Sequence, residues 1–74
     1  MERENFRAVA LQETRKKIRD LKEFNIPVIT RTIEQYEQAG VEEIFVQQQK
    51  ALLDKVYSRL QELEDKEQRL QEGV

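Results

Sequence analysis

The chain lacks the side chains on which most enzyme mechanisms depend. It contains no histidine and no cysteine, so it can build neither a Ser–His nor a Cys–His nucleophile pair, and it has no disulfide or thiolate chemistry. Ser58 is the only serine, and it lies inside a predicted helix with no base to activate it. The two glycines, Gly40 and Gly73, are too far apart in the sequence to form a phosphate-binding loop. We therefore expect a protein that is not an enzyme, with no catalytic residues and no cofactor.

Carboxylates are the one metal-binding group that the chain holds in number. The densest group is Glu62, Glu64, Asp65 and Glu67. Oxygen ligands of this kind suit Mg²⁺, but a di-iron bundle would also require a Glu-x-x-His pattern, which is absent. Lys66 and Arg69 are interleaved with the acidic residues, at spacings that favour exposed ion pairs along a helix. We interpret the group as a solvated helix face and predict no metal site.

A run of basic residues between positions 15 and 22 is the sharpest candidate for ligand binding. Arg15, Arg19 and Lys22 would lie on one side of the first predicted helix, where they could follow nucleic-acid phosphates. Asp20 and Glu23 lie within the same patch of the helix surface, and each could form an ion pair with the basic residue four positions earlier. The chain has a net charge of −2, and no aromatic residue stands among the basic ones to stack on bases. Nucleic-acid binding is therefore the alternative hypothesis.

Helix-breaking residues divide the chain into the elements that would position these side chains. Pro27, Gly40 and Gly73 are the only prolines and glycines, and residues 41–72 form an unbroken stretch rich in good helix formers. No apolar run approaches the roughly 20 residues that a membrane span needs, and the charged N-terminus precedes no apolar signal core. The sequence predicts one small all-α domain over residues 1–74, in the cytoplasm and without membrane contact.

Apolar periodicity predicts one helix over about 3–24 and a second over about 27–38. The apolar face of the first consists of Ala10, Leu11, Thr14, Ile18 and Leu21, with Phe6 and Phe24 at its edge. That of the second consists of Ile26, Ile29, Ile33 and Tyr36. Counted along one continuous helix, the two stripes lie only about 50° apart, so a single arm could present both. Pro27 removes a backbone donor and disfavours helical geometry at the residue before it; whether it kinks or breaks this arm stays open.

Gly40 is expected to reverse the chain. A continuous helix through it would place the third apolar face roughly 180° from the second, which would require two separate cores. A left-handed C-cap at Gly40 brings the faces together instead. The sequence therefore predicts a helical hairpin whose second arm is a long helix over about 42–70, followed by a frayed end at 71–74. Residues 1–26 hold seven basic and five acidic side chains, and residues 41–74 hold five and eight, so the arms attract weakly.

The apolar face of the long helix is broader than one partner helix can cover. A heptad seam comprises Val46, Gln49, Leu53, Val56, Leu60, Leu63, Glu67 and Leu70. Phe45 and Leu52 flank this seam, and such breadth is typical of a bundle. A chain of 74 residues also builds only a thin core, so we expect a homo-oligomer, with a dimer favoured, that forms a four-helix-type bundle. The alternative is a monomeric three-helix bundle in which the short middle helix packs separately.

We expect a non-enzymatic protein–protein interaction module that acts through amphipathic helix faces, such as a small regulator, adaptor or assembly factor. The residues predicted to contact another copy or a protein partner are Phe45, Gln49, Leu52, Leu53, Val56, Leu60 and Leu63. Gln49 could select register within the apolar face or lie at its rim. In the alternative hypothesis, the nucleic-acid contacts are Arg15, Arg19 and Lys22.

Overall fold

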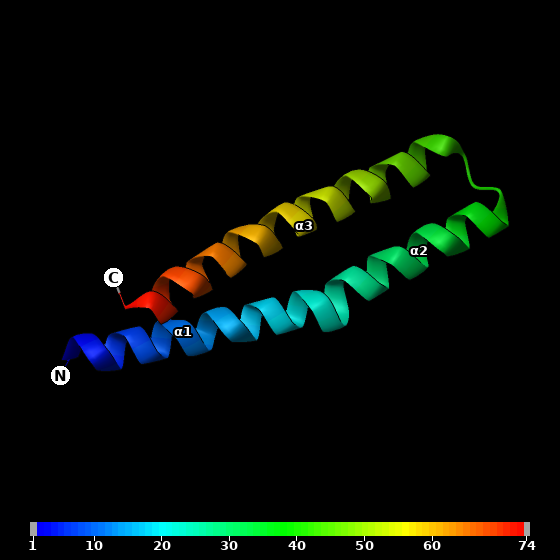
Figure 1. Cartoon of the computed structure of the whole chain (residues 1–74). Helices are drawn as coiled ribbons and strands as arrows, with labels where there is room; N and C mark the ends of the chain where they lie inside the picture. The colour runs from blue at the N-terminus through cyan, green and yellow to red at the C-terminus, as the bar shows by residue number, and fades with distance from the viewer. Residues whose placement is uncertain (1, 74) are drawn as a thin grey trace.

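Two long helical arms fold back on each other to form a hairpin (Figure 1). The structure, a computed structural model, describes residues 2–73. The first arm contains α1 (Glu2–Asp20), a π-helical turn η1 (Leu21–Asn25) and α2 (Ile26–Ala39), and the second arm is α3 (Glu43–Glu72). Both ends of the described chain lie at one end of the hairpin, and the connecting turn lies at the other. The predicted all-helical hairpin is confirmed over these residues, which contain no strand.

The turn at Gly40 has the predicted left-handed geometry, with φ 69° and ψ 30°. The N–H of Gly40 donates to the carbonyl of Glu37, and the N–H of Val41 donates to the carbonyl of Tyr36 at 3.1 Å. These two bonds form a Schellman motif, which satisfies carbonyls that the end of α2 leaves free. Two residues later α3 begins, and no side chain caps its N-terminus.

The long helix extends slightly further than the sequence suggested. We expected it over about 42–70, and α3 continues to Glu72. Residues 71 and 72 of the segment expected to fray are therefore helical, and Val74 lies outside the described residues.

The π-helical turn joins α1 and α2 into one arm. The N–H of Ile26 donates to the carbonyl of Leu21, five residues earlier, so these two side chains lie one turn apart. In an α-helix, a five-residue step would set them about 140° apart. The wide turn directly precedes Pro27, whose ring would clash with a carbonyl four residues earlier in a regular helix. The first arm is therefore continuous through Pro27, and α1 and α2 pack together on α3 instead of forming a three-helix bundle.

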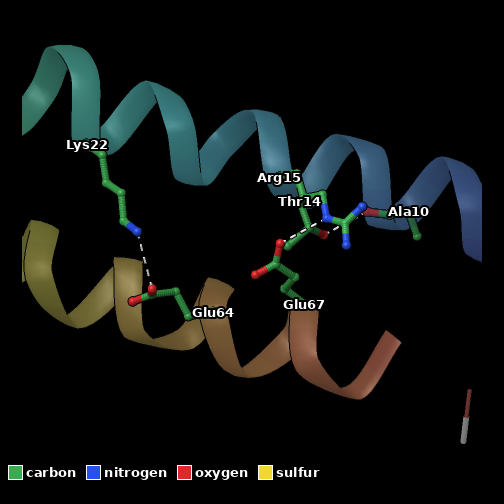
Figure 2. Close-up of polar contacts among 6 residues, drawn as sticks. All are labelled: Ala10, Thr14, Arg15, Lys22, Glu64 and Glu67. Atoms are coloured by element: carbon green, nitrogen blue, oxygen red, sulfur yellow. Dashed lines mark hydrogen bonds and ion pairs between the residues drawn. The ribbon is translucent and has the colours of Figure 1, made fainter. Parts of the chain in front are cut away.

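The core is a single seam between the arms, and it contains two apolar clusters. The cluster nearer the chain ends contains Ile18, Leu60 and Leu63, with Leu21 and Ile26 packed against them. The cluster nearer the turn contains Ile29, Ile33 and Val46, with Tyr36, Leu53 and Val56 packed against them. Thr14 is also buried, and its hydroxyl donates to the carbonyl of Ala10 at 2.7 Å (Figure 2). The predicted apolar stripes of both arms are therefore the surfaces that meet.

The hairpin is a thin rod. It measures 57 × 16 × 14 Å, and its radius of gyration is 16.6 Å, whereas a compact domain of this length has a radius of about 11 Å. Only six apolar residues are buried among those described. A rod of two helices leaves the flanks of its seam open to solvent, and the candidate site lies on one of these flanks.

Candidate interaction surface

The two sides of the seam differ in character. One side, which we call the closed side, carries the polar contacts that α1 and η1 make with α3 (Figure 2). Arg15 Nε lies 3.0 Å from Glu67 Oε2, and Lys22 Nζ lies 3.5 Å from Glu64 Oε2. Nearer the chain ends, the guanidinium of Arg7 donates to the carbonyl of Gly73 at 3.2 Å. Each exposed ion pair contributes only about 0–1 kcal/mol to stability, but together these contacts occupy this side of the seam.

Three shallow hollows follow one another along the other side of the seam, which we call the open groove. Each is lined by residues of both arms, among them Val28 and Leu52 in the first, Asp20 and Arg59 in the second, and Glu13 and Lys66 in the third. Leu52, Arg59 and Lys66 recur every seven residues and so share one flank of α3. Arg59 and Glu64 are about 140° apart around α3, which places the groove and the ion pairs on opposite sides of the seam.

The hollow nearest the turn is apolar. Its volume is about 380 Å³, and Phe24, Val28 and Leu52 line it above the more deeply placed Ile29 and Val56. Phe24 and Val28 are each 61% exposed, and Leu52 is 44% exposed. Phe45 lies one heptad before Leu52 on the same flank and is also exposed. A cluster of large exposed apolar side chains marks a site of interaction more often than single scattered ones do.

The other two hollows combine charged and apolar side chains. Lys17 and Asp20 from the first arm and Arg59 from α3 line the middle hollow, together with the apolar Leu21 and Leu63. The hollow nearest the chain ends is lined by Glu13 and Lys17 of α1 and by Lys66 of α3, and also by apolar residues of α1, namely Phe6, Val9 and Ala10. Charged side chains therefore line the middle hollow and the hollow near the chain ends, whereas none line the hollow near the turn.

The residues predicted to form an interface divide into two groups in the structure. Leu60 and Leu63 are buried in the seam of the same chain, and Gln49, Leu53 and Val56 are half-buried along it. Phe45 and Leu52 remain exposed on the open groove. Sequence reasoning did not include in the interface the residues opposite them on the first arm, Phe24, which it placed at the edge of the first apolar face, and Val28. A usable signal existed, because these two apolar residues are four apart and lie beside the buried isoleucine stripe.

The three basic residues proposed for nucleic-acid contact do not form one free ridge. Arg15 and Lys22 extend across to carboxylates of α3, and Arg19 lies on the outer surface of α1. The local ion pairs expected of Asp20 and Glu23 do not form; among the side chains that the structure describes, the ion pairs instead link the first arm with α3 or lie within α3. Glu64 and Glu67 of the carboxylate group are thus engaged by the first arm. In the same part of the chain, no three acidic side chains come close enough to hold a metal ion.

Comparisons with known proteins add no family to this description. No protein-family model matches the sequence, and searches of curated proteins and of solved structures found no significant match. No helix within the described range is both long enough and apolar enough to cross a membrane.

Proposed function

We propose that this chain is a non-enzymatic protein–protein interaction module of the cytoplasm that acts as a small regulator, adaptor or assembly factor. The observation that carries the proposal is the apolar part of the open groove, where Phe24, Val28 and Leu52 expose large side chains around one hollow. Covering such a surface removes apolar area from water, at about 25 cal/mol per Å². In this proposal the module assembles as a homo-oligomer, with a dimer favoured, and offers its helix faces to protein.

Photo-crosslinking from the groove tests this function. A photoreactive amino acid in place of Val28 should form crosslinks to protein, whereas the same amino acid in place of Ile44 should not. Ile44 is a matched control because the two side chains have nearly equal exposure, 61% and 60%, while Ile44 lies about 160° around α3 from the buried Val46, on the outer face. Equal crosslinking from both positions, or none from Val28 in the native cell, would contradict the proposal.

Nucleic-acid binding through Arg15, Arg19 and Lys22 is less well supported. Two of these three cations already face carboxylates at 3.0 and 3.5 Å, so part of their charge is neutralised within the hairpin. Binding by phosphate contacts would weaken steeply as salt rises and would be abolished by reversing the charge of Arg19. Absence of binding to a duplex oligonucleotide at low salt would remove this alternative.

A further inference from the structure

The hairpin exposes more surface than a stable chain of its mass usually does. Its accessible area is 6055 Å², whereas a compact monomer of 8.9 kDa exposes about 4,800 Å². The excess of about 1,200 Å² is larger than the roughly 800 Å² that each partner contributes to a standard stable interface. One partner of similar size, packed along the rod, would therefore bring the chain to ordinary burial.

The pattern of the open groove indicates which partner fits. The lining of each hollow includes one residue from each arm whose side chains would complement each other: Val28 and Leu52, Asp20 and Arg59, and Glu13 and Lys66. A two-fold axis parallel to the rod sets each hollow of one groove against the same hollow of a second copy. It also places the first arm of each copy opposite the second arm of the other. Each side chain then faces the partner copy's other member of its pair, so apolar meets apolar and acid meets base.

The opposite orientation lacks this match. Along the first arm, Val28 lies eight residues from Asp20 toward the turn, and Glu13 lies seven residues from it toward the N-terminus. A two-fold axis perpendicular to the rod at the middle hollow would therefore set the hollow near the turn of each copy, which has no charged lining residue, against the other copy's Glu13, Lys17 and Lys66. Burying unpaired charge against apolar side chains is costly.

We propose that the open groove docks the open groove of a second copy of this chain, with both turns at the same end, to form a parallel four-helix bundle of two hairpins. This inference rests on the proposed function and specifies the occupant of its surface. The closed sides, with the Arg15–Glu67 and Lys22–Glu64 ion pairs, face outward in this assembly. Lys17, which lines the middle hollow and the hollow near the chain ends, has no acidic counterpart in the pairing, but its side chain is exposed, and an exposed unmatched charge costs little.

Sedimentation equilibrium of the purified chain tests whether a second copy occupies the open groove. The wild-type chain should sediment as a dimer at about 100 µM and have a melting temperature that rises with protein concentration. Leu52→Glu should weaken dimerisation at least about tenfold, whereas Tyr57→Glu should leave it near the wild-type value. The two side chains are 44% and 49% exposed on the same helix but lie on opposite sides of the seam. A wild-type monomer with a concentration-independent melting temperature overturns the proposal, even if Leu52→Glu fails to fold.

The relative orientation of the two copies can be measured separately with a spin label. Because the chain has no native cysteine, a single introduced cysteine defines the labelled position. A spin label on Gln38→Cys, at the exposed end of α2, should give an inter-copy distance of about 20–30 Å in the parallel bundle, which is two to three helix diameters. A distance near the 57 Å length of the rod would show the antiparallel arrangement and reject the pairing. If the purified chain is monomeric but crosslinks from Val28 reach a different protein, the inference and the homo-oligomer part of the proposed function fail, while the function as a protein–protein interaction module stands. If those crosslinks are also absent, both fail.

Discussion

Arg15 Nε and Glu67 Oε2 lie 3.0 Å apart and join positions 52 residues apart in the chain. This pair holds α1 against the end of α3 on the closed side of the hairpin. The Arg15 side chain is 50% exposed and that of Glu67 is 29% exposed, so solvent screens much of their attraction. The pair accordingly helps to set the orientation of the arms, while the apolar seam supplies most of the stability.

A double-mutant cycle measures this contribution. Arg15→Ala and Glu67→Ala should each destabilise the hairpin slightly, with a coupling free energy of about 0.2–1 kcal/mol that decreases as salt is raised. Urea unfolding monitored by circular dichroism gives the free energies of unfolding of the wild type, the two single variants and the double variant. As a control, Arg19→Ala should show no coupling with Glu67→Ala, since Arg19 is on the outer surface. Coupling of several kcal/mol, or coupling that salt does not change, would not fit an exposed pair.

The turn should be sensitive at one backbone position. Gly40→Ala should lower the free energy of unfolding by about 1–2 kcal/mol, because a Cβ at a positive φ crowds the following carbonyl. Its φ is 69°, and no other atom lies within 4 Å of the added Cβ, so the loss reflects the backbone alone. Gln38→Ala, on the exposed end of α2, is the control and should change stability little. Equal stability of Gly40→Ala and wild type would show that the turn adopts another conformation.

The start of α3 should be open to improvement. Glu42 occupies the N-cap position with φ −52° and ψ 140°, but its side chain makes no capping hydrogen bond. Glu42→Ser should stabilise the hairpin by about 0.5–1 kcal/mol, because a serine hydroxyl accepts a hydrogen bond from a free backbone N–H of the first turn. Thermal unfolding gives the change, and Glu43→Ser one residue inside the helix should produce no such gain. A destabilised Glu42→Ser would indicate that the helix begins elsewhere.

The spacing of the first arm explains both what sequence reasoning recovered and what it missed. The buried faces and the reversal at Gly40 were predictable because helical periodicity and glycine geometry act locally. The path of the chain through Pro27 was not predictable. Leu21 and Ile26 are five residues apart just before this proline, and that spacing is compatible with either a kink or a break. The structure shows a π-helical turn that places Leu21 and Ile26 on the same cluster. The groove residues Phe24 and Val28 were missed because their neighbourhood depends on how the two arms are aligned.

A deletion tests this account of the π-helical turn. Removing Asn25 shortens the Leu21–Ile26 step to four residues, which suits a regular helix, and Pro27→Ala in the same chain removes the ring clash. This variant should keep the helical content and stability of the wild type. Removing Thr30 in a chain that also carries Pro27→Ala should cost about 2–5 kcal/mol, because it rotates Ile33 and Tyr36 out of the seam. Equal losses of stability from both deletions would mean that the π-helical turn does not compensate for the five-residue spacing of Leu21 and Ile26.

The charged part of the groove yields a test of the proposed dimer. Glu13→Lys should weaken dimerisation several-fold, since two copies of the like-charge contact with Lys66 arise across the two-fold axis. Adding Lys66→Glu should restore the wild-type dissociation constant by exchanging the charges. Sedimentation equilibrium at low salt measures both. Failure of the second substitution to restore dimerisation would argue against Glu13 facing Lys66 of another copy.

The position of the chain ends has a mechanical consequence. Because Glu2 and Gly73 lie at the same end of the rod (Figure 1), a force that separates the termini peels the arms apart instead of shearing them. The load reaches the Arg7–Gly73 contact first, then Arg15–Glu67 and Lys22–Glu64. The two apolar clusters open one after the other, and the turn at Gly40 is the last part to feel the pull. Such a hairpin should open at low force from its ends, and resist far more strongly when pulled lengthwise between its turn and its ends.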